Sequence, residues 1–168
     1  KFTYEIQDKP EGIAQAFIIG ENFIGEDSVA LILGDNIFED DFSEQIKAFK
    51  SGGHVFAKKV PDPERFGVVT FNESGVAGRI VEKPKERVSD YAVPGLYLYD
   101  NRVVSNAKNL APSPRGELEI TDVNNVYLEK GELTVSTVAG AWLDAGTFDS
   151  LLAANLLIAK QEGSRVLS

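Results

Sequence analysis

An uninterrupted run of five apolar residues, Val29-Ala30-Leu31-Ile32-Leu33, constrains the fold of this chain more than any other segment. The run stops at Gly34-Asp35, a pair typical of turns. Because no polar residue alternates with the apolar ones, we expect both faces of this strand to be covered, as in a parallel sheet. The run therefore predicts a central strand in a chain of the α/β class.

Strand-like and helix-like segments alternate along the chain. Two β-prone stretches, 66–71 and 76–81, are separated by Asn72-Glu73-Ser74-Gly75, which favours a hairpin. Periodicity and capping residues predict helices over 12–23, 41–49, 102–107, 121–130 and 147–160, and strands over 54–60, 96–99 and 133–138. Together they predict a single domain over residues 1–168, with a mixed, mainly parallel central sheet and flanking helices.

Length and charge limit the class of protein. A chain of 168 residues is long enough for one ordinary hydrophobic core. Seventeen basic and 26 acidic residues give a formal net charge of −9, which argues against nucleic acid and anionic membranes as partners. No apolar run approaches the ~18 residues of a membrane span.

The chain has no cysteine, one histidine and no methionine. Disulfides, thiolate nucleophiles and metal sites built from Cys or His clusters are therefore excluded. The lack of cysteine fits a reducing cytoplasm. Because a complete translation product normally begins with Met, we expect the chain to be a fragment.

Two aspartates follow apolar stretches at predicted turns. Asp35 and Asn36 come directly after the first strand, and Asp144 precedes the predicted C-terminal helix. Ligands of open α/β sheets bind beyond the carboxyl ends of strands, and Mg²⁺ prefers one or two carboxylates with water and phosphate oxygens. A magnesium site is one interpretation of these residues, and a turn or cap role for each aspartate is the other.

Glu82-Lys83-Pro84 ends the second strand of the predicted hairpin. A lysine at a strand end can bind a phosphate, although a solvated surface pair is the commoner role for such residues. Gly67 either permits close approach of a ligand or simply opens a strand. Trp142 is more typical of a core residue than of a ligand platform. The segment 115–122 has the composition of a surface loop followed by a helix cap.

Seven ordered segments, taken together, are far more specific than any one of these signals. They are QDKPEGIAQAF (7–17), LGDNIF (33–38), DPERFGV (62–68), EKP (82–84), AVPGLYLYD (92–100), RGELEITDVN (115–124) and WLDAGT (142–147). In this order they closely resemble the glucose-1-phosphate thymidylyltransferases of the sugar-nucleotidyltransferase superfamily. The resemblance covers nearly the whole chain and implies a Rossmann-like nucleotidyltransferase fold.

The resemblance also implies roles for individual residues. Asp35 and Asp144 match two Mg²⁺-binding aspartates, and Lys83 matches the residue that holds the sugar phosphate, so these three are the expected catalytic residues. Gln7 and Gly12 match residues that contact the thymine base. The residues that match the wall around glucose 1-phosphate are Asn36, Gly67, Glu82, Lys83, Val93 and Trp142.

The activity implied by the resemblance is transfer of a thymidylyl group from dTTP to glucose 1-phosphate. The products are dTDP-glucose, for dTDP-rhamnose and polysaccharide biosynthesis in the cytoplasm, and pyrophosphate. A sister activity with UTP or CTP is a close alternative. A fragment that binds sugar phosphate or forms oligomers without catalysis is an alternative of another class.

This sequence departs from the family pattern at several places. The opening strand and the glycine-rich loop that cradle the triphosphate have no counterpart in it, and it stops soon after the last predicted helix. Pro94 replaces a usual threonine, and Ala139-Gly140 shortens a turn. We therefore expect the chain alone to be inactive, and the strand over 29–33 to have an open edge that favours a homo-oligomer.

Overall fold

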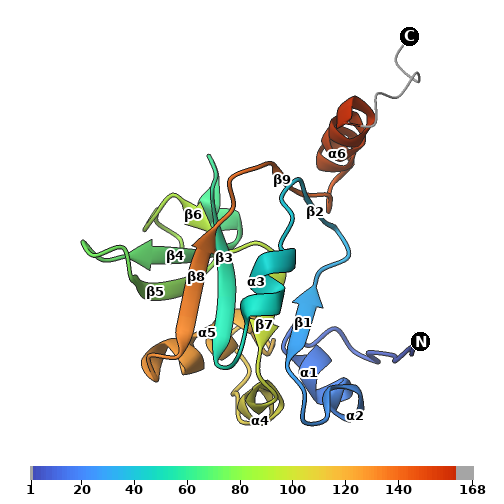
Figure 1. The fold of residues 1–168 in the computed structure, drawn as a ribbon, viewed down its shortest axis with the longest axis vertical. Helices are drawn as coiled ribbons and strands as arrows, with labels where there is room; N and C mark the ends of the chain where they lie inside the picture. The colour runs from blue at the N-terminus through green and yellow to red at the C-terminus, as the bar shows by residue number, and fades with distance from the viewer. Residues whose placement is uncertain (1, 162–168) are drawn as a thin grey trace.

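The computed structural model of the chain describes residues 2–161 and has α/β architecture, as the sequence predicts (Figure 1). The main sheet has the strand order β1 (Val29–Ile32), β7 (Leu96–Tyr99), β3 (Gly53–Lys59), β6 (Tyr91–Ala92), β4 (Gly67–Phe71) and β5 (Ala77–Glu82), and β8 (Leu133–Thr137) also pairs with β3. A second sheet consists of β2 (Asn36–Phe38) and β9 (Trp142–Asp144).

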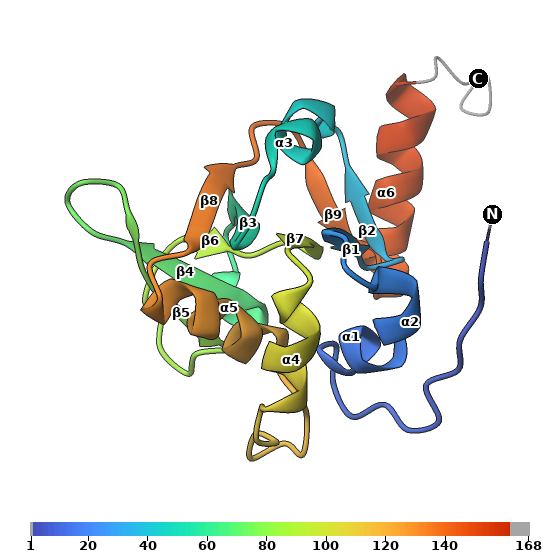
Figure 2. The same ribbon diagram turned by 60° about the horizontal axis from the view of Figure 1, so that its bottom comes forward.

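Helices cover both faces of the main sheet. The helices are α1 (Gln15–Ile19), α2 (Glu21–Ile24), α3 (Ser43–Ala48), α4 (Arg102–Lys108), α5 (Ile120–Glu129) and α6 (Phe148–Gln161), with one 3₁₀ turn, η1 (Pro63–Arg65). Figure 2 shows α3 on one side of the sheet and α1, α4 and α5 on the other. No helix within residues 2–161 is long and apolar enough to cross a membrane.

The predicted mainly parallel sheet is wrong. Among the described pairings only β3 with β8 is parallel, and the others, including β1–β7 and β3–β7, are antiparallel. The reason is that β7 lies between β1 and β3 and runs against both of them. β1, β3 and β8 therefore do share one direction, as strand–helix–strand connections require, but an inserted strand separates β1 from β3.

The prediction of a central strand over 29–33 is also wrong for the described residues. β1 lies at the edge of the sheet order, with β7 as its one strand neighbour. Its side chains alternate between half-buried and exposed, and Ile32 is 59 % exposed. An apolar run does not distinguish an edge strand from a covered one, because only the neighbouring strands decide between them. Within residues 2–161, one edge of β1 pairs with no strand, as expected from the family resemblance.

The main core lies between the sheet and the layer of α1, α4 and α5. Tyr99 is fully buried, packs edge-to-face on Phe17 at 5.4 Å, and donates a hydrogen bond to Asn124. The predicted helix over 12–23 is present as two short helices, α1 and α2, which meet at Gly20. Because the helix breaks there, Phe17 and Ile24 both pack in the same core cluster.

The C-terminal helix forms where it is predicted, but most of its apolar side chains lie on the surface. Phe148 is 93 % exposed and Leu152 60 %, whereas Ala154 is buried. Figures 1 and 2 show α6 standing beside β2 and β9, away from the main sheet. The predicted apolar stripe is therefore largely uncovered in this part of the chain.

Asp100 links the end of β7 to the loop before β3 and to α5. It accepts hydrogen bonds from the Gly52 amide at 2.7 Å and the Tyr127 hydroxyl at 3.0 Å, and it forms an ion pair with Arg102 at 2.6 Å. Burial acts to raise the pKa of Asp100, but bonds from Arg102, Gly52 and Tyr127 outweigh it and hold the pKa below its ordinary value.

We predict that Asp100→Ala lowers the free energy of unfolding by about 3 kcal/mol at pH 7, because it leaves donor groups of three residues, Gly52, Arg102 and Tyr127, without their acceptor. A lowered pKa means that the carboxylate stabilises the fold above the ordinary carboxyl pKa and that this contribution is lost as the pH falls through the lowered value. Urea titrations at pH 7 and in acid measure both effects. A cost that stays the same in acid would contradict the role of the charge.

Candidate active site

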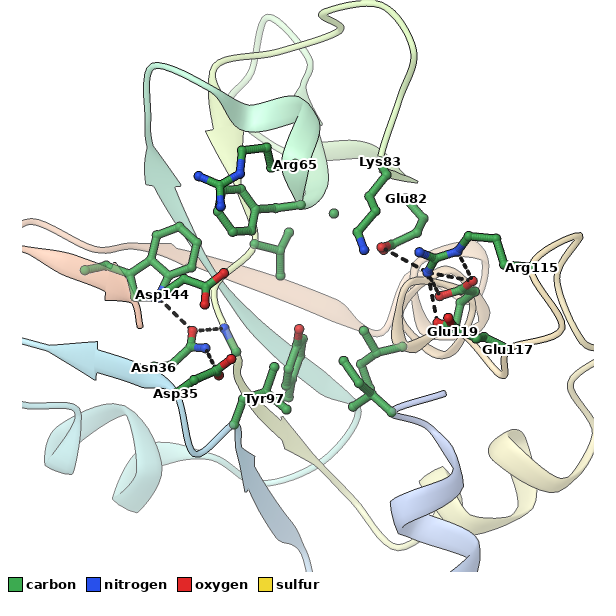
Figure 3. Close-up of a pocket in the computed structure, with 18 residues that line it drawn as sticks. Asp35, Asn36, Arg65, Glu82, Lys83, Tyr97, Arg115, Glu117, Glu119 and Asp144 are labelled. Carbon is green, nitrogen blue, oxygen red and sulfur yellow. Dashed lines mark hydrogen bonds and ion pairs between the residues drawn. The ribbon is translucent and has the colours of Figure 1, made fainter. Parts of the chain in front are cut away.

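A cavity of about 270 Å³ lies where β2, β5, β7 and β9 meet the loop before α5 (Figure 3). Its wall is rich in charged side chains from segments far apart in the sequence. The polar and charged residues that line it are Asp35, Asn36, Arg65, Glu82, Lys83, Arg115, Glu117, Glu119 and Asp144. Each of the residues expected to bind the metal or the sugar phosphate lines this cavity, whereas Gln7 and Gly12 do not.

Asp35 and Asp144 come together because β2 pairs with β9. The register places Asn36 opposite Asp144, and the Asp35 carbonyl oxygen accepts a hydrogen bond from the Ala145 amide at 2.7 Å. A Cβ atom on Gly146 would lie 3.1 Å from Asp144 Oδ1 and 3.5 Å from Asp35 Oδ2. The two carboxylate oxygens are thus no farther apart than the sum of these distances. Their role as metal ligands stays a prediction.

Asn36 connects the two-stranded sheet with the wall of the cavity. Its Oδ1 accepts hydrogen bonds from Trp142 Nε1 at 2.7 Å and from the Gly95 amide at 2.8 Å, and its Nδ2 donates to Asp35 Oδ1 at 2.9 Å. Trp142 is 9 % exposed and packs on Phe66 with ring centroids 4.9 Å apart. Trp142 is therefore both a core residue and part of the cavity wall.

Lys83 is held toward the cavity by an uncommon backbone conformation. Its φ is +38°, the one positive value at a residue other than glycine among those described. The Lys83 amide donates to the Phe66 carbonyl at 3.0 Å, which fixes the exit of the chain from β5. Positive φ at a non-glycine residue costs about 1–2 kcal/mol and is commonest at functional sites. Within residues 2–161, Lys83 takes part in no ion pair.

A charged cluster around Arg115 forms the wall beside Lys83. Arg115 bonds both carboxylate oxygens of Glu119 at 2.9 to 3.1 Å, pairs with Glu117 at 3.0 Å, and lies 3.7 Å from Glu82 Oε1. Burial acts to raise the pKa of Glu119, but hydrogen bonds from Arg115 and Ser113 hold it below its ordinary value. Residues 115–119 do form a loop that ends at the N-cap of α5, as expected, but this loop lines the cavity and Glu119 in it is buried, so its description as a plain surface loop is wrong.

Glu82, Thr121 and Gly67 fit closely together on the same wall. Thr121 Oγ1 donates to Glu82 Oε2 at 2.6 Å, so one oxygen of this carboxylate is fixed. A Cβ on Gly67 would lie 3.0 Å from Thr121 Oγ1 and 3.4 Å from Glu82 Oε2. The Gly67 carbonyl in turn accepts a bond from the Val93 amide at 2.8 Å, which brings Val93 into the wall. Gly67 thus permits close packing as well as starting β4.

Arg65 lines the opposite side of the cavity, next to Asp144 in Figure 3. Its guanidinium pairs with Asp62 at 2.9 Å and lies 5.4 Å from the centre of the Phe66 ring. The hydrogen bond that Arg65 donates to Asp62 raises the pKa of Arg65, with a smaller contribution from the charge of Asp144. Arg65 and Arg115 could not be singled out from the sequence, since an arginine next to an acidic residue is common on surfaces.

Gln7 and Gly12 lie beside a smaller hollow of about 260 Å³. Ile13 and Glu117 line both this hollow and the main cavity, so the two adjoin. Gln7 Nε2 donates to the Gly12 carbonyl at 3.3 Å and to Gln15 Oε1 at 2.5 Å. Gly12 has a φ of +106°, and a Cβ there would overlap the Leu118 carbonyl oxygen.

The donor set fits a particular kind of metal site. Among residues 2–161, no group of three or more acidic or histidine side chains is arranged to hold a metal ion. Two converging carboxylates beside an open cavity instead suit a hard cation that takes its other ligands from water and substrate phosphates. Mg²⁺ held by Asp35 and Asp144 fits this arrangement, and a site built only from protein ligands does not.

Residues 1–161 match a protein-family model described as nucleotidyl transferase. A glucose-1-phosphate thymidylyltransferase of Neisseria meningitidis is 56 % identical over 155 residues, which are 89 % of this chain and 54 % of that protein. The glucose-1-phosphate thymidylyltransferase of Mycobacterium tuberculosis H37Rv is 54 % identical, with the same coverage. The chain thus spans about half the length of these curated relatives.

Solved structures show the same fold. A Bacillus anthracis protein assigned as a glucose-1-phosphate thymidylyltransferase and crystallised with sucrose superposes with a TM-score of 0.86 at 52 % identity. That match covers 93 % of this chain and 64 % of the other. A UDP-glucose pyrophosphorylase complexed with UDP-glucose gives a TM-score of 0.82 at 23 % identity and covers 95 % of this chain and 66 % of the other, a likeness of fold alone.

Gly12 and Gly116 allow a test of why glycine occupies position 12. Both have positive φ, but a Cβ on Gly116 would meet no atom within 4 Å, whereas one on Gly12 would overlap Leu118. Gly116→Ala should cost about 1 kcal/mol for backbone conformation alone, and Gly12→Ala at least ~1 kcal/mol more. Thermal unfolding without ligand measures both. Equal costs would show that packing on Leu118 is not the reason for this glycine.

Proposed function

Because this chain belongs to the nucleotidyl transferase family, we propose that its cavity is part of an active site that transfers a thymidylyl group from dTTP to glucose 1-phosphate. The main observation in support of this proposal is that Asp35, Asp144 and Lys83 line one cavity although they come from separate segments. The relatives from Neisseria meningitidis and Mycobacterium tuberculosis, both glucose-1-phosphate thymidylyltransferases, support the choice of substrates.

In the proposed reaction a phosphate oxygen of glucose 1-phosphate attacks the α-phosphorus of dTTP. The new P–O bond forms as the bond to the β-phosphate oxygen breaks, so that dTDP-glucose and pyrophosphate are the products. Such a transfer needs little covalent chemistry from the protein and depends on positioning and on neutralising negative charge. The residues with these roles are the proposed catalytic residues Lys83, Asp35 and Asp144.

Lys83 is the group best suited to hold the sugar phosphate. Arg115 and Arg65 are already paired with carboxylates, whereas Lys83 takes part in no ion pair of the described residues. An unpaired ammonium loses the least existing interaction when a phosphate binds. This local cation explains how a chain with a formal net charge of −9 binds a polyanion.

Asp35 and Asp144 would hold Mg²⁺, which supplies charge neutralisation at the transferred phosphate when it is bound. The protein's contribution is to keep the two carboxylates converged. Asn36 donates to Asp35 Oδ1 and fixes the orientation of that carboxylate. The β2–β9 register fixes Asp144 opposite Asn36.

The sugar and the base would bind on different sides of this metal site. Glu82 Oε2 is taken by Thr121, which leaves Oε1 to accept hydrogen bonds from sugar hydroxyls. The remaining wall that we assign to glucose 1-phosphate consists of Asn36, Gly67, Val93 and Trp142. We assign the adjoining hollow beside Gln7 and Gly12 to the thymine base, because it opens from the main cavity at Ile13 and Glu117. We further propose that the protein acts in the cytoplasm as a homo-oligomer.

Pyrophosphate release from dTTP and glucose 1-phosphate in the presence of Mg²⁺ tests this function, with UTP and CTP as the competing nucleotides. Calorimetric titrations with each substrate complete the test. Binding of glucose 1-phosphate without binding of any triphosphate would favour the non-catalytic alternative for these 168 residues. Equal use of dTTP, UTP and CTP would contradict thymine selection beside Gln7.

Lys83→Ala should weaken binding of glucose 1-phosphate by roughly ten- to a hundredfold, because it removes the charged hydrogen bond to the phosphate. Lys85→Ala is the matched control, since Lys85 is an exposed lysine two residues away that does not line the cavity. Calorimetry measures both affinities. An unchanged affinity in Lys83→Ala would return Lys83 to the role of a solvated surface residue.

A further inference from the structure

The connection between β8 and β9, residues 138–141, leads directly to two residues of the candidate site. β9 begins one residue after Ala141 and carries Trp142 and Asp144. Figure 1 shows this connection leaving the main sheet at the end of β8 and passing to the two-stranded sheet. Its conformation therefore sets where β9 lies relative to the rest of the cavity.

Lys58 binds the backbone carbonyl groups of this connection. From β3, its Nζ donates to three consecutive carbonyl oxygens, those of Val138 at 3.3 Å, Ala139 at 3.0 Å and Gly140 at 2.5 Å. An ammonium group has three protons to donate, so these bonds use its whole capacity. Among the described residues Lys58 forms no ion pair with a carboxylate.

Two acidic residues that follow β2 bind the backbone amide groups of the same connection. Asp40 accepts the Ala139 amide on Oδ2 and the Gly140 amide on Oδ1, both at 2.8 Å. Glu39 Oε2 accepts the Ala141 amide, also at 2.8 Å. A Cβ on Gly140 would lie 2.5 Å from Asp40 Oδ1, so this approach requires glycine.

The two sides of the connection are thus fixed by opposite charges from two different sheets. Charge-assisted hydrogen bonds are roughly twice as strong as neutral ones, and six of them act here on four consecutive residues. Besides these bonds, two backbone hydrogen bonds hold the ends of the connection, from the Val138 amide to the Ala57 carbonyl and from the Glu39 amide to the Ala141 carbonyl, both at 2.9 Å. Ala139, Gly140 and Ala141 between them have almost no side chains to pack. Without the three charged groups, β9 would be held by its three-residue pairing with β2, by the bond of Trp142 to Asn36 and by the packing of Trp142 on Phe66.

We propose that Lys58, Asp40 and Glu39 form a clamp on residues 138–141 that positions Trp142 and Asp144 for metal and sugar-phosphate binding. The three clamp residues are positioning residues, since none of them lines the cavity. The part of the proposal that concerns ligands rests on the proposed function, whereas the clamp itself does not.

The test compares Lys58→Met and Asp40→Asn with the control Lys59→Met. Lys59 is the next residue on β3 and forms an exposed ion pair with Asp90 at 3.3 Å, so the control removes a lysine outside the clamp. Hydrogen exchange at the amides of Ala139, Gly140 and Ala141 reports on the clamp. Fluorescence of Trp142, the one tryptophan of the chain, reports on the site without a label.

We expect exchange at these amides to be at least about tenfold faster in Lys58→Met and in Asp40→Asn, since each loses charged hydrogen bonds. The Trp142 emission should shift to longer wavelength as the indole gains water. Mn²⁺ serves as a probe for the Mg²⁺ site. In both clamp variants, half-maximal quenching of Trp142 should need about tenfold more Mn²⁺ than in the unsubstituted chain. Lys59→Met should match the unsubstituted chain in all three measurements.

Unchanged exchange and emission in both clamp variants would overturn the proposal. If Lys58→Met does not fold, normal exchange in the nearly isosteric Asp40→Asn would overturn it as well. A lack of Mn²⁺ quenching in the unsubstituted chain would contradict the proposed metal site, and exchange and emission alone would then decide on the clamp. Weakened Mn²⁺ quenching in a clamp variant whose amides 139–141 exchange at the normal rate would also contradict the clamp, because the weaker metal binding would then have another cause.

Discussion

The antiparallel pairing of β2 with β9 is the interaction on which the candidate site depends. It joins residues 36–38 to residues 142–144 and is the direct reason that Asp35 and Asp144 share a cavity. Two strands of three residues are too short to be stable alone in water. The pairing is therefore supported from its surroundings, by the indole bond of Trp142 to Asn36, by the packing of Trp142 on Phe66 and by the charges around residues 138–141.

The chain carries a formal net charge of −9, yet positively charged side chains line the cavity. Arg115 is surrounded by Glu82, Glu117 and Glu119, so its charge is largely balanced before any ligand arrives. Lys83 lies beside this cluster without an ion pair of its own among the described residues. In the proposed reaction, a phosphate entering the cavity would meet Lys83 as the one lining cation that forms no ion pair among the described residues, which favours a single binding position over a diffuse attraction.

Local elements could be predicted from the sequence because their signals are local. The hairpin around Asn72, the strand over 96–99 and the helix after Glu119 all follow from residues next to one another. The direction of pairing could not be predicted, because the insertion of β7 between β1 and β3 depends on contacts across the whole fold. Arg115 was missed for the same reason, since Glu82, one of its partners, lies more than 30 positions earlier.

Within the site, hydrogen bonding separates residues that position from residues that remain able to react. Asn36 uses both lone pairs of Oδ1 on Trp142 and Gly95 and one amide proton on Asp35, which leaves one amide proton for a ligand. Its main contribution is thus to fix the indole and the carboxylate on either side of it. Groups that are fixed in this way before substrate binds need no reorganisation when charge develops, which is the condition for strong electrostatic stabilisation of a transition state. For the proposed transfer, the side of β2 and β9 would meet that condition, whereas Lys83, which forms no ion pair among the described residues, would keep its ammonium group available for the incoming phosphate.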